Sequence, residues 1–360
     1  MKRNVRQSHI LLLIVMVLSL VGGFFKPLMS DNLFLVLWQP LLILGPVFFM
    51  LRVNRRPLGP ALRFHSLKGK DVLLLIAVTL TFQPMIAAIV EVANRLFGNQ
   101  LDFVFAGFGN LNPVVLFLSL VLAPTFCEEI LFRGAIMDGY RFKSVKTMII
   151  MNGVLFGLMH GNINQFLYTF VMGVFIAYAV YKTHSLWAGI LMHFVNNGLS
   201  ALAQVYPNNP MVQAEQWMYA TSTGGELARF AVFVAVSILA SLWILTRLER
   251  TPSAQVAYDK WTTLGLEPLD LDQVDTDAVE GRPVSKVSAT QGVIGESNGQ
   301  ISGGVNREKS REAKVQEPPM SPKDEPVFDW ALTVVGVLFV LTSTLIWFAA
   351  SLYEAGLIEM

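Results

Sequence analysis

The chain has 360 residues, of which 53% are hydrophobic and 15% are charged, and its mean hydropathy is +0.51. Soluble proteins carry about 25% charged residues, so this composition excludes an ordinary cytosolic enzyme and indicates a multi-span membrane protein. The net charge of +1 gives no basic field, so we expect no nucleic-acid partner. The single cysteine, Cys127, excludes an intrachain disulfide framework.

Apolar runs that are long enough, or nearly long enough, to cross a bilayer as helices recur along the chain. In chain order they lie at about 9–25, 33–51, 72–90, 111–139, 147–160, 163–181, 185–204, 227–246 and 329–353. Lys2, Arg3 and Arg6 precede the first run as in a signal peptide, but no small-x-small cleavage site follows it, so we expect a retained anchor. The pattern predicts an all-α fold, a multi-span transmembrane helical bundle with a core of eight helices in residues 1–248.

Lys and Arg are distributed unevenly between the loops. If the N-terminus lies inside, fourteen of them fall on the cytoplasmic side, and only Lys26, Arg95 and Arg229 lie near the outer side. Short cytoplasmic loops carry the excess of Lys and Arg in membrane proteins. The sequence therefore predicts a cytoplasmic N-terminus.

Residues 247–328 have a different composition from the predicted spans. They contain 10 Lys and Arg and 14 Asp and Glu, with Gly/Ser-rich stretches and no sustained apolar periodicity. Such a segment cannot bury enough apolar surface to fold. We expect a flexible cytoplasmic linker over 249–327, followed by an additional, ninth transmembrane helix within 328–360.

A few ionisable side chains lie inside the predicted spans, where such groups are costly and indicate functional sites. Counted from the nearest cytoplasmic charges with the helical rise per residue, Glu128 lies about 20 Å deep, His160 about 21 Å and His193 about 16 Å. Three separate helices thus bring polar groups to one level. Together with Asn197, these residues form the candidate site.

Helical phase assigns different positions to these side chains. Glu129 and Arg133 are four residues apart and share a helix face, which predicts an ion pair that lowers the cost of burying both. Glu128 is turned about 100° away from its neighbour and can face a cavity. His193 and Asn197, also four residues apart, present two polar groups on one face.

These groups can perform acyl chemistry together. A carboxylate and His160 could hold and deprotonate a water molecule, with Glu128 as the free carboxylate. His193 and Asn197 could donate hydrogen bonds to a developing oxyanion. This combination is typical of a hydrolase that acts on an acyl bond.

Three motifs follow one another on successive spans: Glu128-Glu129-x-x-x-Arg133, Phe156-x-x-x-His160 and His193-x-x-x-Asn197. In this order they resemble the CPBP family of intramembrane endopeptidases, which includes the type II CAAX prenyl endopeptidases and bacterial relatives linked to bacteriocin processing or immunity. The resemblance covers about 70–205, with its characteristic part at 113–200. It says nothing about the linker or the ninth span.

The resemblance implies roles for the motif residues. In the family, the first Glu and the first His are taken to activate the hydrolytic water, and the later His and Asn to stabilise the oxyanion. The resemblance thus implies an endopeptidase in a prokaryotic plasma membrane, whose partners are the lipid bilayer and a membrane-associated protein or peptide substrate, prenylated or not. Carried over to this chain, the catalytic residues are Glu128, His160, His193 and Asn197, and the supporting residues are Glu129 and Arg133.

Other functions are compatible with parts of the pattern. We expect no cofactor. The two His and two Glu could instead bind zinc. Against zinc, the helical H-E-x-x-H arrangement is missing, and Arg133 competes for the charge of Glu129. A Cys127–His160 protease is a further alternative. A non-catalytic membrane scaffold or bacteriocin-immunity protein of the same fold would use the linker to bind a partner. A proton-coupled transporter would also bury Glu and His, but it usually shows paired repeats.

Overall fold

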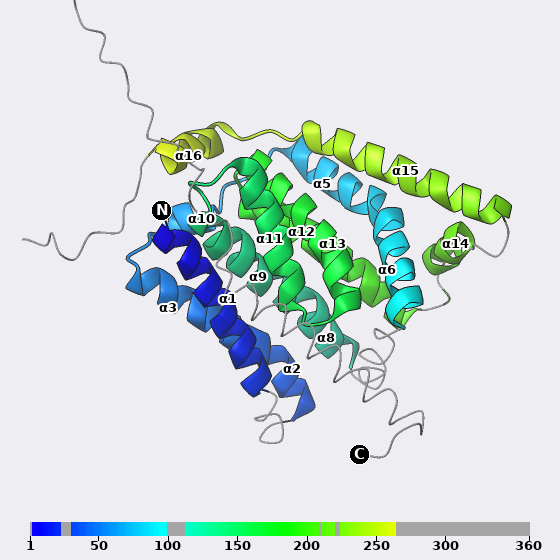
Figure 1. Cartoon of the computed structure of the whole chain (residues 1–360), viewed down its shortest axis with the longest axis horizontal. Helices are drawn as coiled ribbons and strands as arrows, with labels where there is room; N and C mark the ends of the chain where they lie inside the picture. The colour runs from blue at the N-terminus through cyan, green and yellow to red at the C-terminus, as the bar shows by residue number, and fades with distance from the viewer. Residues whose placement is uncertain are drawn as a thin grey trace, which may run out of the picture. The chain divides into compact units, whose positions relative to one another are not determined.

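The computed structural model describes residues 2–22, 30–98, 112–206, 208, 210–219 and 224–263. Within these ranges the chain forms helices and no strands, as the sequence predicted for an all-α protein (Figure 1). The helices are α1 (Lys2–Gly22), α2 (Asp31–Gln39), η2 (Pro40–Leu44), α3 (Gly45–Val53), α4 (Leu58–Leu62), α5 (Gly69–Thr81), α6 (Gln83–Phe97), α8 (Pro113–Leu116), η3 (Phe117–Leu122), α9 (Ala123–Glu129), η4 (Ile130–Ile136), α10 (Met137–Gly139), α11 (Val145–Met159), α12 (Ile163–Thr183), α13 (Leu186–Val205), α14 (Pro210–Tyr219), α15 (Gly224–Thr246) and α16 (Pro252–Thr263). The elements labelled η are π-helical.

In the described ranges, six helical segments are long and apolar enough to cross a membrane. The eight predicted core spans are all helical; α11 is shorter, at 15 residues, and α13 contains polar residues that lower its hydropathy. This confirms a multi-span helical bundle. The ninth predicted span, 329–353, and the predicted linker beyond 263 lie outside the described residues. The six candidate segments are Val5–Gly22, Asn32–Val53, Gly69–Phe97, Pro113–Gly139, Ile163–Thr183 and Gly224–Thr246.

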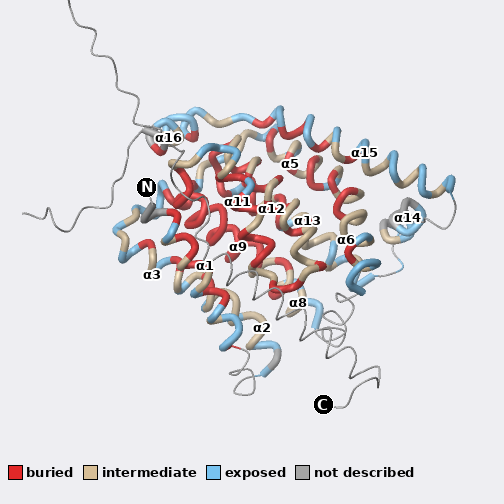
Figure 2. The backbone as a smooth tube through the Cα atoms, in the orientation of Figure 1, coloured by how far each residue is buried: buried red, intermediate tan, exposed pale blue. Residues whose placement is uncertain are grey.

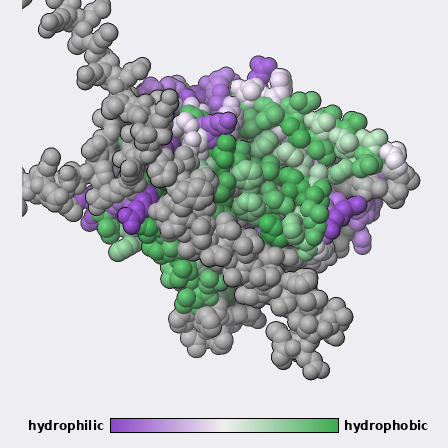
Figure 3. Space-filling view, viewed as in Figure 1, coloured by the Kyte–Doolittle hydropathy of each residue, from purple (hydrophilic) through white to green (hydrophobic). Residues whose placement is uncertain are grey.

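Large apolar side chains remain exposed on the outer helices. Leu239, Trp243 and Leu73 are among them, and hydrophobic residues cover most of the face over α15 and α5 in Figure 3. Water would make such a continuous apolar surface unfavourable, whereas lipid chains solvate it. The buried residues gather instead on the central helices α9, α11, α12 and α13 (Figure 2).

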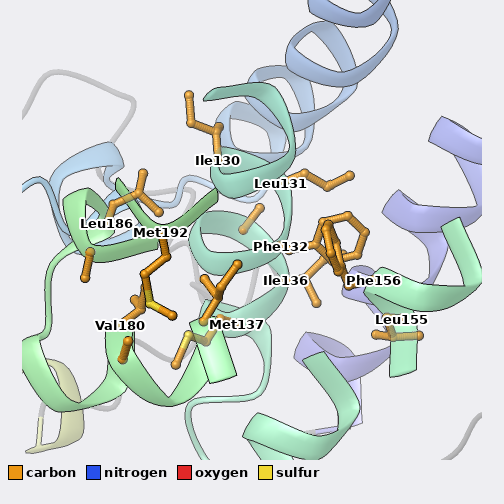
Figure 4. Packing of buried hydrophobic residues seen from close by; sticks show 14 of the residues in the cluster. Ile130, Leu131, Phe132, Ile136, Met137, Leu155, Phe156, Val180, Leu186 and Met192 are labelled. Carbon is orange, nitrogen blue, oxygen red and sulfur yellow. The ribbon is translucent and has the colours of Figure 1, made fainter. Parts of the chain in front are cut away.

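The core between these central helices is filled by interlocking apolar side chains. Phe132 of η4 and Phe156 of α11 pack edge to face, with their ring centroids 5.0 Å apart (Figure 4). Glycine residues bring α11 and α12 together, since a Cβ atom on Gly153 would lie 2.6 Å from Val174 Cγ2 and 2.8 Å from the Phe170 carbonyl oxygen. Small residues at helix contacts are the usual device for close packing in membranes.

Replacement of this glycine tests the close contact. Gly153→Ala is expected to lower the stability of the folded protein by about 1–3 kcal/mol, because the neighbouring backbone carbonyl cannot move aside as a side chain could. The matched control is Gly198→Ala in α13, where a Cβ atom would meet nothing within 4 Å. Thermal unfolding in detergent compares the two variants. Equal melting temperatures would contradict the assigned contact.

The beginning of the predicted linker is helical, which corrects the boundary expected from composition. Residues 252–263 form α16, and Trp261 is buried, with its indole Nε1 donating a hydrogen bond to Asp138 Oδ1 at 3.0 Å. Ala254 and Tyr258 precede Trp261 on the same helical face. This apolar stripe lies in a largely polar 12-residue helix, so composition alone did not reveal it.

Helix α16 packs on a cluster of polar groups, in which Trp261 contacts Asp138 of α10, Arg63 and His184. The Arg63 guanidinium lies over the Trp261 ring, 5.2 Å from its centroid, and burial lowers the pKa of Arg63 to about 10. Burial, and then the neighbouring Arg63 cation, lower the pKa of His184 to about 2, so that imidazole is neutral at physiological pH. Arg63 Nη2 also donates a hydrogen bond to the Arg133 carbonyl, which connects this cluster to η4.

An exposed ion-pair cluster connects α5 with the end of α15. Lys68 Nζ and Lys70 Nζ lie 2.6 Å and 2.5 Å from the carboxylate oxygens of Glu249. Hydrogen bonds from these two lysines lower the pKa of Glu249 from 4.5 to about 2. The stabilising contribution of Glu249 is therefore complete above pH 4.5 and is lost as the pH falls toward 2.

This sign of the pKa shift gives a prediction for stability against pH. The melting temperature of Glu249→Gln is expected to lie slightly below that of the unmodified protein at pH 6, because exposed ion pairs contribute little. The difference is expected to shrink between pH 4.5 and pH 2.5. Thermal unfolding in detergent at a series of pH values measures it. A difference that grows in acid would contradict the assignment.

Candidate active site

The two glutamates lie at the end of α9, between the π-helical segments η3 and η4. Proline cannot supply the N–H that an α-helix needs, so Pro124 at the beginning of α9 leaves the Leu120 carbonyl without its ordinary helical donor. π-Helical turns often occur at functional sites, where they rotate the side chains that follow. Glu128 is 7% exposed and Glu129 is fully buried.

Glu129 is the centre of a buried charged network. Its Oε1 accepts hydrogen bonds from Arg133 Nη1 at 2.8 Å and from His193 Nδ1 at 2.9 Å. The ion pair predicted from the i,i+4 spacing is therefore present, with both side chains inaccessible to solvent. Arg133 Nη2 also donates to the Gly173 carbonyl at 3.1 Å, and its guanidinium carbon lies 4.5 Å from the centroid of the Phe156 ring.

Gly189 of α13 makes room for the Glu129 carboxylate. A Cβ atom at this position would overlap Glu129 Oε2, so only glycine allows the carboxylate to approach the helix this closely. Gly189 also lies one turn before His193 on the same helix. The carboxylate therefore reaches the Nδ1 side of the His193 ring.

His193 faces both glutamates through its two ring nitrogens. Nδ1 is bonded to Glu129, and Nε2 lies 3.9 Å from Glu128 Oε2. Because a buried carboxylate accepts at Nδ1, this nitrogen carries a proton, and Nε2 can donate a hydrogen bond only when the ring is the imidazolium. Glu129 thus fixes the orientation of the His193 ring.

His160 follows the last residue of α11 and is half buried. Its Nδ1 lies 2.9 Å from the Phe156 carbonyl oxygen. A carbonyl can only accept, so Nδ1 carries the proton, and Nε2 of the neutral ring is the acceptor. The Phe156 ring lies edge to face with both imidazoles, at centroid distances of 5.1 Å to His160 and 5.8 Å to His193.

Asn197 joins the same span by a different contact. Its Nδ2 donates to the Leu120 carbonyl at 3.1 Å, and its Oδ1 accepts from Asn196 Nδ2 at 3.2 Å. Among the described residues, Asn197 makes no direct hydrogen bond to Glu128 or to His193, and Glu128 makes none to His160. The structure therefore places the predicted residues around one region, with Phe156 between the two imidazoles.

Three residues near the site were given no role in the prediction from the sequence. The Phe156 ring and Gly189 act through packing, and Asn196 Nδ2 donates a hydrogen bond to Asn197 Oδ1. The signal for Phe156 was its place in the motif, four residues before His160. The signal for Gly189 was its spacing of four residues from His193, which places both on one helix face.

In the described part of the chain, no three His, Cys, Asp or Glu side chains are arranged so that they could hold a metal ion. Glu129 is engaged by Arg133 and His193, as set out above. Cys127 is buried, and it makes no hydrogen bond with His160 in the described structure.

A comparison with protein-family models finds a match for one segment of the chain. Residues 110–199 match the family model described as "Type II CAAX prenyl endopeptidase Rce1-like". This match supports membership of the CPBP family for the segment that carries the site. The matched segment contains all three motifs, from Glu128 to Asn197, and supports a function of the CAAX-type intramembrane protease kind, a family whose substrates are membrane-associated peptides. No curated protein and no solved structure matches the chain.

Proposed function

We propose that this CPBP protein hydrolyses a peptide bond of a membrane-associated protein or peptide with a water molecule activated by Glu128. The observation that supports it best is the position of Glu128 beside His193, with Nε2 of the ring 3.9 Å from the carboxylate and Nδ1 held by Glu129. A free carboxylate and a polarised imidazole in one buried region are the parts that acyl hydrolysis needs.

The first step is attack of water on the scissile carbonyl carbon. The Glu128 carboxylate takes one proton from the water while the new C–O bond forms, and His160 Nε2 accepts a hydrogen bond that orients the water. The carbonyl oxygen becomes an oxyanion. His193 Nε2–H, of the imidazolium form, and Asn197 Nδ2–H donate to it, and the Glu129 carboxylate holds the His193 ring in place through Nδ1.

The second step is collapse of the tetrahedral intermediate. The C–N bond breaks, and protonated Glu128 gives its proton to the departing amine, so the enzyme returns to its starting state. Arg133 neutralises the charge of Glu129 throughout and keeps that carboxylate from acting as a second base. This account gives Glu129 a positioning role in addition to its ion pair.

We further propose a prokaryotic plasma membrane with the N-terminus in the cytoplasm, as the Lys and Arg distribution indicates. By helical rise the polar groups lie about 16–21 Å from the cytoplasmic charges, which is inside the bilayer, and we propose that the substrate reaches them from the cytosolic leaflet. Neither assignment depends on whether the substrate is prenylated.

Cleavage in proteoliposomes tests the proposed function. The purified full chain is incubated with lipid-anchored peptides that carry a fluorophore and a quencher on either side of the bond, in matched prenylated and acylated forms, with and without chelator. We expect cleavage that persists in chelator. Activity that chelator abolishes and zinc restores would replace the water-activating carboxylate with a metal centre, and no cleavage of any membrane peptide would favour a non-catalytic scaffold.

A further inference from the structure

A chain of side-chain amides reaches the Asn197 side chain from the helix pair α5–α6. Gln83 Nε2 donates to Asn196 Oδ1 at 3.2 Å, Asn196 Nδ2 donates to Asn197 Oδ1 at 3.2 Å, and Asn197 Nδ2 donates to the Leu120 carbonyl at 3.1 Å. Gln83 Nε2 donates a second hydrogen bond to the Thr79 carbonyl at 2.9 Å. Every bond in this chain runs in the same direction.

The far end of the chain depends on Pro124. In an α-helix the Leu120 carbonyl would accept from the N–H of residue 124, which proline lacks. A backbone carbonyl within a membrane span needs a donor, and the Asn197 amide supplies one. The span that carries Glu128 therefore presents an acceptor to α13 at this point.

The direction of the bonds determines which way the Asn197 amide faces. A flipped Asn197 would place its Oδ1 against the Leu120 carbonyl and its Nδ2 against Asn196 Nδ2, which are two repulsive contacts. Asn196 is held in the same way, because its Oδ1 is occupied by the Gln83 donor. In the observed arrangement one N–H of Asn197 Nδ2 donates to the Leu120 carbonyl, and the second N–H can donate to a substrate.

We propose that Gln83 is a positioning residue that acts through Asn196 to hold the Asn197 amide with its N–H toward the reacting carbonyl. This inference rests on the proposed function, in which Asn197 donates to the oxyanion. Gln83 lies outside the segment 110–199 that matches the family model. Its side chain bonds to the Thr79 carbonyl and to Asn196, so its effect on catalysis passes through two neighbouring amides.

The test is Gln83→Met, which keeps the length of the side chain and removes the donor. We expect kcat to fall about tenfold with KM unchanged, a part of the 10²- to 10³-fold loss typical of removing an oxyanion donor. In an Asn197→Ala background, which already lacks the positioned amide, Gln83→Met is expected to cause no further loss. Asn196→Leu is expected to give the same loss as Gln83→Met, and the two together no more than either.

Thr81→Val is the matched control, because it removes a hydrogen bond between spans, the one between the Thr81 Oγ1 and Ser241 Oγ hydroxyls at 3.1 Å, that involves no member of the amide chain. It is expected to leave kcat unchanged. Wild-type kcat in Gln83→Met, or the same tenfold loss in the Asn197→Ala background, would overturn the inference while leaving the proposed function intact. Full activity in Asn197→Ala would instead overturn the oxyanion role on which the inference depends.

Discussion

Glu128→Gln is expected to lower the rate of peptide cleavage by about 10³-fold, within the range that loss of a general base causes. The amide has nearly the same shape as the carboxylate and can accept a hydrogen bond from water, but it cannot take the proton. Glu128 forms no ion pair with arginine or lysine in the described structure, so the substitution breaks no salt bridge to a permanent cation. The initial cleavage rate in proteoliposomes measures the effect.

The matched control is Glu91→Gln. Glu91 is an exposed carboxylate paired with Arg95 at 2.7 Å on α6, so its loss changes the charge by the same amount away from the site. It is expected to cleave at the unmodified rate. Both variants are expected to melt within a few degrees of the unmodified protein in detergent. Cleavage by Glu128→Gln at the rate of the Glu91→Gln control would remove Glu128 from the mechanism.

Arg133→Met is expected to cause the largest loss of stability, about 3–5 kcal/mol, because it leaves the Glu129 carboxylate buried without its cation. The methionine side chain fills part of the space of the arginine, so the loss arises mainly from the unpaired charge. The hydrogen bond to the Gly173 carbonyl and the contact with the Phe156 ring are lost too. Unfolding by denaturant in mixed micelles measures the difference.

The double variant Glu129→Gln/Arg133→Met separates the charge from the packing. Replacing both partners of a buried ion pair with neutral residues costs much less than removing one. We therefore expect the double variant to recover a large part of the stability that Arg133→Met loses. It is not expected to recover cleavage, because the Glu129 carboxylate that holds the His193 ring through Nδ1 is gone. Equal instability of the single and double variants would contradict the assigned pair.

The parts of the site that were predicted from the sequence follow from regular helical geometry. Glu129 and Arg133 are bonded as their four-residue spacing requires. The rise per residue predicts Glu128, His160 and His193 at one level. In the structure the Phe156 ring contacts both imidazoles, and His193 also lies beside the Glu128 carboxylate. Distances along one helix depend on a single element and survive any rotation of its neighbours.

The contacts that were not predicted depend on how helices face one another. The hydrogen bond from His193 to Glu129 forms only if α13 is rotated correctly relative to α9, and so does the space that Gly189 leaves for the carboxylate. Residue spacing within one helix does not determine this rotation. The amide chain from Gln83 to Asn197 likewise joins three spans. At α16 the prediction of a flexible linker was wrong because it relied on composition. One buried side chain, Trp261, holds a helix that is otherwise largely polar.

The most direct test of the central claim is a single-turnover cleavage in ¹⁸O-labelled water with the protein in excess over a lipid-anchored peptide. Direct attack by an activated water predicts one ¹⁸O atom in the new carboxylate, release of the amine and acid fragments at equal rates, and no peptide bound covalently to the protein. Release of the amine fragment ahead of the acid fragment, together with a peptide-labelled protein in the mass spectrum, would show an acyl-enzyme and contradict the role of Glu128 as the base that activates water.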